Sequence, residues 1–86
     1  MPELSRFFGI SIRMYYDDHN PPHFHAIYGG AEAEVGLDPV ALLRGRLARR
    51  ALGMVMEWAV VHQRELLDDW ELLRKDQTPH GIAPLD

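Results

Sequence analysis

The sequence predicts an α+β fold in which an antiparallel meander of three or four strands packs on a C-terminal helical segment. Residues 9–37 contain three stretches of alternating apolar and polar side chains, and this period is typical of half-buried strands. Residues 47–75 instead repeat apolar side chains at intervals of three and four, as an amphipathic helix does. Strands that precede the helices, rather than alternate with them, indicate an α+β architecture.

The composition is that of a single ordinary globular domain over residues 1–86. Hydrophobic residues make up 47% and charged residues 26%, which excludes a disordered chain. The absence of cysteine excludes disulfides and thiolate metal ligands. The N-terminus has no secretory pattern, and the richest apolar run, residues 51–61, contains Glu57 and is too short to span a bilayer. We therefore expect a cytoplasmic protein that does not contact membranes.

Three strands are predicted in chain order. Residues 9–16 alternate cleanly between apolar and polar side chains, and residues 17–22 form a turn because its two prolines cannot continue a sheet ladder. Residues 23–28 and 31–37 alternate again, and in the first of these strands the core face is expected to carry Phe24, Ala26 and Tyr28. The Gly29-Gly30 pair between them supplies the positive φ angles of a tight hairpin.

The hairpin register follows from this turn. A two-residue loop pairs Tyr28 with Ala31 and therefore His25 with Glu34, and it places apolar residues opposite apolar residues. A slip by one residue would mix the two faces of the sheet. We expect His25 and Glu34 to be cross-strand neighbours on the face that points away from the helix, with Cβ atoms about 5 Å apart.

The segment of residues 38–46 allows two interpretations. Asp38 and Pro39 suit the N-cap and first turn of a short helix that Gly45 would end. The same residues suit a turn followed by a short fourth strand.

The helical pattern changes direction near His62. Beyond this residue the apolar stripe rotates, and Glu65 and Asp69 occupy the face that was apolar before. Because a straight helix would bury both carboxylates, we expect either one long helix kinked at residues 62–66 or two consecutive helices. The tail, residues 79–86, is expected to be extended and held by its two large apolar side chains, Ile82 and Leu85.

A histidine cluster is the main candidate site. His23 and His25 alternate on a predicted strand, so both imidazoles leave the same face as Glu34. Asp18 and His19 precede them in the turn and are expected to lean over this open sheet face. We therefore expect the three histidines to gather within reach of one ligand.

Three interpretations of this cluster stay open. The residues can form an ordinary turn and cross-strand pair, or a face that binds a partner or an anion. Alternatively, His23, His25 and Glu34 can bind a divalent metal, or a histidine–carboxylate pair can act as general acid and base.

Arginines form the second candidate site. The net charge is −4, which makes general nucleic-acid binding unfavourable, but residues 44–50 alone carry +4. Arg49 and Arg50 start the predicted helix, where the macrodipole disfavours cations and attracts anions. The Arg44–Arg50 patch can therefore bind phosphate, nucleic acid or an acidic partner, or it can form exposed salt bridges to acidic strand residues.

Several motifs together resemble one small bacterial family, domain of unknown function 4160. The resemblance covers nearly the whole chain, and its most specific element is the HNPPHFH run of residues 19–25. Further matching stretches are Ser5–Ile10, Arg13–Tyr16, Arg49–Leu52, Trp58, Ile82 and Pro84-Leu85. The family tends to have proline before the Arg-Arg pair, where this chain has Ala48, so the helix start is less sharply defined.

The resemblance implies a compact α+β domain but no catalytic residues. Genes of such proteins often lie beside those of a second small family, in arrangements that look like toxin–antitoxin pairs. We therefore expect a protein-interaction module with a small partner protein and no obligatory cofactor. The alternatives are an RNase-like phosphodiesterase, in which His19, His23 or His25 act with Arg49 and Arg50, and a domain that binds a divalent metal.

Overall fold

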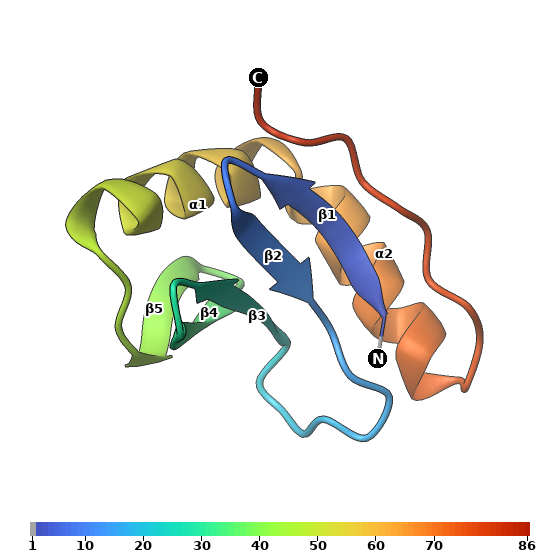
Figure 1. Ribbon diagram of the computed structural model, residues 1–86. Helices are drawn as coiled ribbons and strands as arrows, with labels where there is room; N and C mark the ends of the chain where they lie inside the picture. The colour runs from blue at the N-terminus through green and yellow to red at the C-terminus, as the bar shows by residue number, and fades with distance from the viewer. Residues whose placement is uncertain (1) are drawn as a thin grey trace.

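The computed structural model describes residues 2–86 as a five-stranded antiparallel sheet followed by two helices (Figure 1). The strands pair in chain order, so the sheet is a simple meander. Their bounds are β1 Glu3–Phe7, β2 Ile10–Arg13, β3 His23–Tyr28, β4 Ala31–Leu37 and β5 Val40–Gly45, and the helices are α1 Arg49–Val61 and α2 Gln63–Arg74. The α+β meander is confirmed, with five strands in place of the expected three or four.

Strand β1 is the element that the sequence pattern missed. It pairs with β2, but the register shifts between Glu3 and Ser5. Because of this irregularity, the consecutive residues Leu4 and Ser5 are both buried, and the alternation typical of a strand is lost.

Strand β5 resolves the ambiguity over residues 38–46. Val40 pairs with Leu37, so Asp38 and Pro39 form a two-residue turn and the helical interpretation is wrong. β5 ends at Gly45, whose φ of +80° is unfavourable for other residues.

The β3–β4 hairpin has the expected register. Tyr28 pairs with Ala31 and His25 with Glu34. Gly29 and Gly30 both have positive φ, 57° and 80°, as a tight two-residue turn requires.

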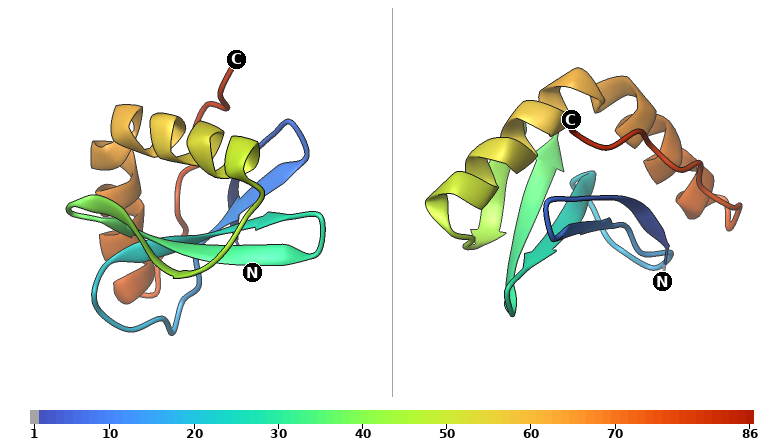
Figure 2. Two further views of the ribbon diagram at one scale, coloured as in Figure 1. Left: turned by 90° about the vertical axis from the view of Figure 1, so that its left-hand side faces the viewer. Right: turned by 45° about the horizontal axis from the view of Figure 1, so that its top comes forward.

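Two helices, rather than one kinked helix, cover one face of the sheet (Figure 2). They meet at His62, which is the C-cap of α1 and the N-cap of α2. The break keeps Glu65 exposed, but it does not keep both carboxylates out of the interior, because Asp69 is only 1% exposed.

The core lies between the sheet and the helices, and its centre is Trp58. The Trp58 ring packs 5.4 Å from Phe7 and 5.8 Å from Phe24, measured between ring centroids. Among residues 2–86, no helix is long and apolar enough to cross a membrane.

The C-terminal tail runs beside β1 and the helices, as Figure 1 shows. The Ile82 N–H donates to the Leu4 carbonyl at 2.8 Å, and Trp58 Nε1 donates to the Ala83 carbonyl at 2.8 Å. Ile82 is buried and Leu85 packs partly buried against the core, so the expected role of these two residues is confirmed.

Candidate functional site

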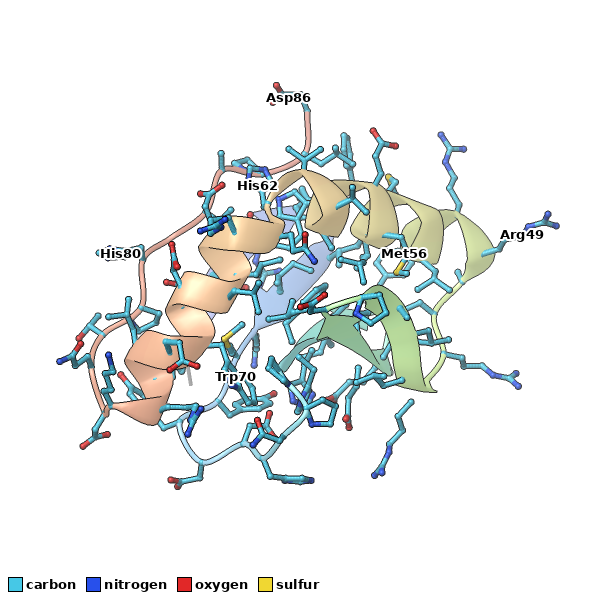
Figure 3. All side chains as sticks on the ribbon, turned by 180° about the vertical axis from the view of Figure 1, so that it is seen from behind. Arg49, Met56, His62, Trp70, His80 and Asp86 are labelled. Carbon is cyan, nitrogen blue, oxygen red and sulfur yellow. The ribbon has the colours of Figure 1, made fainter. Side chains whose placement is uncertain are left out.

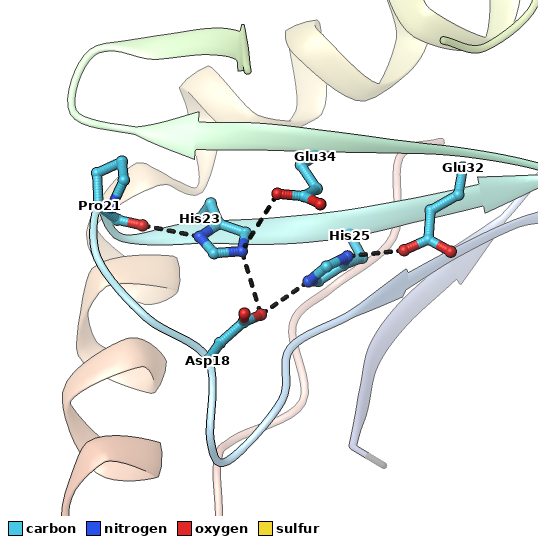
Figure 4. Close-up of polar contacts among 6 residues, drawn as sticks. All are labelled: Asp18, Pro21, His23, His25, Glu32 and Glu34. Atoms are coloured by element: carbon cyan, nitrogen blue, oxygen red, sulfur yellow. Dashed lines mark hydrogen bonds and ion pairs between the residues drawn. The ribbon is translucent and has the colours of Figure 1, made fainter. Parts of the chain in front are cut away.

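The loop between β2 and β3 brings Asp18 back over the start of β3 (Figure 4). Its Oδ2 atom lies 2.7 Å from His25 Nε2 and 3.1 Å from His23 Nε2. One carboxylate oxygen therefore contacts two imidazoles. We call Asp18, His23 and His25 the His–Asp cluster.

The other nitrogen of each imidazole also has a partner. His23 Nδ1 lies 2.7 Å from the Pro21 carbonyl oxygen, and His25 Nδ1 lies 2.8 Å from Glu32 Oε2. A carbonyl and a carboxylate can only accept hydrogen bonds, so each Nδ1 carries the proton and donates it. This leaves both Nε2 atoms directed at Asp18.

The cluster is covered, so the expectation of an open sheet face is wrong. His23 is 3% and His25 7% exposed. Tyr15 from the loop packs on His25 with ring centroids 4.4 Å apart, and Trp70 from α2 packs on His23 at 5.4 Å. Burial, followed by the nearby charge of Glu32, raises the pKa of Tyr15.

Glu34 is opposite His25 as expected, but its carboxylate lies by the other histidine. Glu34 Oε1 is 3.7 Å from His23 Nε2, whereas Glu32 holds His25. Sequence reasoning missed this role of Glu32. The signal was available, since a residue two positions along the facing strand is a diagonal neighbour within reach of a long side chain.

His19 stays at the edge of the cluster. It is exposed, and its ring centroid lies 6.5 Å from that of His23. Within residues 2–86, the group with metal-binding spacing consists of Asp18, His23 and His25, whose ligand atoms all lie within 4.8 Å of one another. The loop therefore contributes Asp18 to this group rather than His19.

The arginines form a separate surface. Arg44, Arg46, Arg49 and Arg50 are all exposed, and within the described chain none pairs with an acidic side chain within 4.0 Å. Arg44 is opposite Glu34 in the sheet register, but no ion pair joins them. Figure 3 shows Arg49 at the start of α1, well away from Trp70, which packs on the His–Asp cluster.

A surface hollow of about 420 Å³ lies beside the arginines. Phe8 and Tyr28, from the tips of two hairpins, line it together with Arg50 and Met54 of α1. Phe8 is 59% exposed and Tyr28 37% exposed, so Tyr28 does not lie in the core as its place in the strand pattern suggested. We call Phe8, Tyr28, Arg50 and Met54 the hairpin-tip surface.

Comparison with known proteins gives one match. A family model described as a domain of unknown function (DUF4160) matches residues 9–71. No curated protein and no solved structure matches the chain.

Proposed function

This chain belongs to the DUF4160 family, and from its surfaces we propose that it is a small protein-interaction module. The proposal includes a cytoplasmic location and a role as one component of a toxin–antitoxin-type pair. The partner docks on the hairpin-tip surface. The single observation that carries this proposal is the exposed, strained aromatic residue Phe8.

Phe8 occupies a position that suits a different residue. It is the first residue of the two-residue turn between β1 and β2, with φ 50°, and Gly9 follows with φ 80°. Such turns favour Asn-Gly, because asparagine tolerates positive φ better than an aromatic residue does. The left-handed conformation costs a non-glycine residue about 1–2 kcal/mol. An aromatic ring that is strained and exposed at a hairpin tip is best explained by a contact outside this chain.

The surroundings of Phe8 support a partner of a particular chemistry. Tyrosine, arginine and methionine are enriched in protein interfaces, and the hollow combines them around one apolar surface. Arg49 and Arg46 lie close to Arg50 in the chain and have no acidic partner within the described residues. The complementary surface is an apolar or aromatic side chain flanked by carboxylates.

The RNase-like alternative receives less support from the geometry. It needs histidines that reach a phosphate and arginines that hold it. His23 and His25 are buried, and the start of α1 lies away from the loop that carries Asp18 (Figures 1 and 3). RNA binding at the Arg44–Arg50 patch and RNA cleavage are the results of the experiment below that would favour this alternative.

The test is co-expression of the tagged full chain with the product of the neighbouring gene, followed by affinity measurement. Phe8→Asn keeps the turn and removes the ring, so we expect binding about tenfold weaker or worse. Arg50→Glu reverses the charge at the hollow and should weaken binding at least as much.

Arg64→Glu is the matched control, since Arg64 is an exposed arginine on α2. It should leave the affinity unchanged. Equal binding by wild type, Phe8→Asn and Arg50→Glu would overturn the docking surface. Co-purification of RNA, or growth arrest that needs His25, would instead favour the nuclease.

A further inference from the structure

We propose that the His–Asp cluster is a binding site for a borderline divalent transition metal such as Zn²⁺. The ligands are Asp18 Oδ2, His23 Nε2 and His25 Nε2. The site is independent of the hairpin-tip surface.

The first argument is the placement of the ring protons. The Pro21 carbonyl and the Glu32 carboxylate each hold one Nδ1–H, at 2.7 and 2.8 Å. This is the arrangement by which proteins orient metal-binding histidines, in which one ring nitrogen donates to a carbonyl or carboxylate and the other binds the metal. Both histidines show it independently, one with each kind of acceptor.

The second argument is what then faces Asp18. With protons on Nδ1, each Nε2 presents a lone pair to a carboxylate oxygen, at 2.7 Å for His25 and 3.1 Å for His23. Lone pairs at these distances repel unless positive charge lies between them. A single proton can occupy only one of the two contacts, and protons on both Nε2 atoms would place two imidazolium ions side by side in a buried site, with ring centroids 5.1 Å apart. One divalent ion satisfies all three atoms at once.

The third argument is spacing. Atoms bound to one tetrahedral Zn²⁺ lie about 3.3 Å apart. The two contacts of Asp18 are shorter than this by a few tenths of an ångström, and all three atoms lie within 4.8 Å of one another. Asp18 is on a loop, whereas its two partners are on β3, so a small outward shift of the loop opens the space for an ion.

The ligand set selects the class of metal. Two imidazoles and one carboxylate suit Zn²⁺, Co²⁺ or Ni²⁺, whereas Mg²⁺ and Ca²⁺ prefer oxygen ligands. Three protein ligands leave at least one coordination position open. Glu34, with Oε1 3.7 Å from His23 Nε2, is an additional carboxylate close to that position, and a water molecule is the alternative.

The experiment is a titration of the EDTA-treated full chain with Zn²⁺, and separately with Co²⁺, by calorimetry and absorption spectroscopy. We expect one ion per chain and a visible Co²⁺ spectrum of low coordination number. Asp18→Asn and His25→Gln should weaken binding at least tenfold. Glu32→Gln, which changes only the partner of His25 Nδ1, should weaken it about tenfold.

His62→Gln and His19→Gln are the matched controls, because both histidines lie outside the group of three ligands. Both should bind as the wild type does. Circular dichroism identifies variants that fail to fold. If the other variants fail, the test of metal binding rests on Asp18→Asn, which keeps the shape of the side chain. Absence of equimolar binding by folded wild type, or an equal loss in His19→Gln, would overturn the proposal.

Discussion

Asp18 holds the loop between β2 and β3 against the sheet by placing its Oδ2 2.7 Å from Nε2 of His25. The two residues are seven positions apart in the chain, so the contact ties the loop to strand β3. Its carboxylate is 14% exposed and the His25 side chain 9%, so solvent screens the contact only weakly. In the metal-free protein a single proton between these two atoms makes the contact a hydrogen bond, and this bond positions the loop.

Removal of this contact should destabilise the fold. We expect Asp18→Ala, measured by urea unfolding in the presence of EDTA, to lower the free energy of unfolding by about 1–3 kcal/mol, the range for charged hydrogen bonds with a buried partner. Asp17→Ala is the control, because Asp17 is exposed. Equal losses in the two variants would mean that the contact contributes nothing.

Asp69 should make stability depend on pH. Burial raises the pKa of this carboxyl above its ordinary value of 3.8. Its Oδ1 accepts the His80 N–H at 2.8 Å, while Oδ2 has no partner among residues 2–86. The folded protein therefore holds the proton more tightly than the unfolded chain. The stabilising contribution of protonated Asp69 is fully present below pH 3.8 and is lost as pH rises through the raised pKa.

Asp69→Asn removes this dependence and keeps an acceptor for His80. We expect the variant to be more stable than wild type at neutral pH, with a difference that shrinks toward pH 4 and vanishes below the ordinary pKa of 3.8. Thermal unfolding across this range measures it. Asp68→Asn, at an exposed neighbour, should show no such trend, and a constant difference for Asp69→Asn would refute the assignment.

Two tryptophans offer a matched pair for testing the C-terminal tail. Trp58 Nε1 donates to the Ala83 carbonyl, whereas Trp70 Nε1 is buried without a partner in the described chain. Trp58→Phe should therefore lower the free energy of unfolding by about 1 kcal/mol more than Trp70→Phe does. It should also speed hydrogen exchange at the Ile82 amide. If Trp70→Phe costs as much and Ile82 exchange stays unchanged, the hydrogen bond does not hold the tail.

Two glycines should respond to alanine in opposite directions. Gly45 has φ +80°, and a Cβ there would overlap the Glu32 carbonyl oxygen. Gly53 lies in α1 with no atom near its potential Cβ. We expect Gly45→Ala to lower the free energy of unfolding by at least about 1–2 kcal/mol, and Gly53→Ala to raise it by about 0.5–1 kcal/mol. Urea unfolding distinguishes the two, and the same sign for both would contradict the geometry.

The sequence was most informative where one local rule decides the structure. The Gly29-Gly30 turn determines the β3–β4 register, and the rotated apolar stripe locates the helix break at His62. β1 escaped prediction because its bulge buries the adjacent residues Leu4 and Ser5. Tyr28 was wrongly assigned to the core, because alternation along a strand does not show where the helices stop covering that strand.

The candidate site was predictable in part for the same reason. His23, His25 and Glu34 share a face by strand periodicity, and the backbone pairing of His25 with Glu34 follows from register alone. The burial of the cluster does not, because it depends on how the loop folds back and on Trp70, which α2 brings from far along the chain. The way in which the loop folds back also explains why Asp18, rather than His19, reaches the imidazoles.

Hydrogen exchange of the chain alone and in complex with its partner tests the proposed interaction module most directly. On binding, we predict slower exchange at the Phe8-Gly9 turn, the Gly29-Gly30 turn and the first turns of α1, which surround the hairpin-tip surface. The β2–β3 loop and α2 should exchange as before. Protection confined to residues 17–25 or to α2, with the two hairpin tips unchanged, would contradict the docking surface.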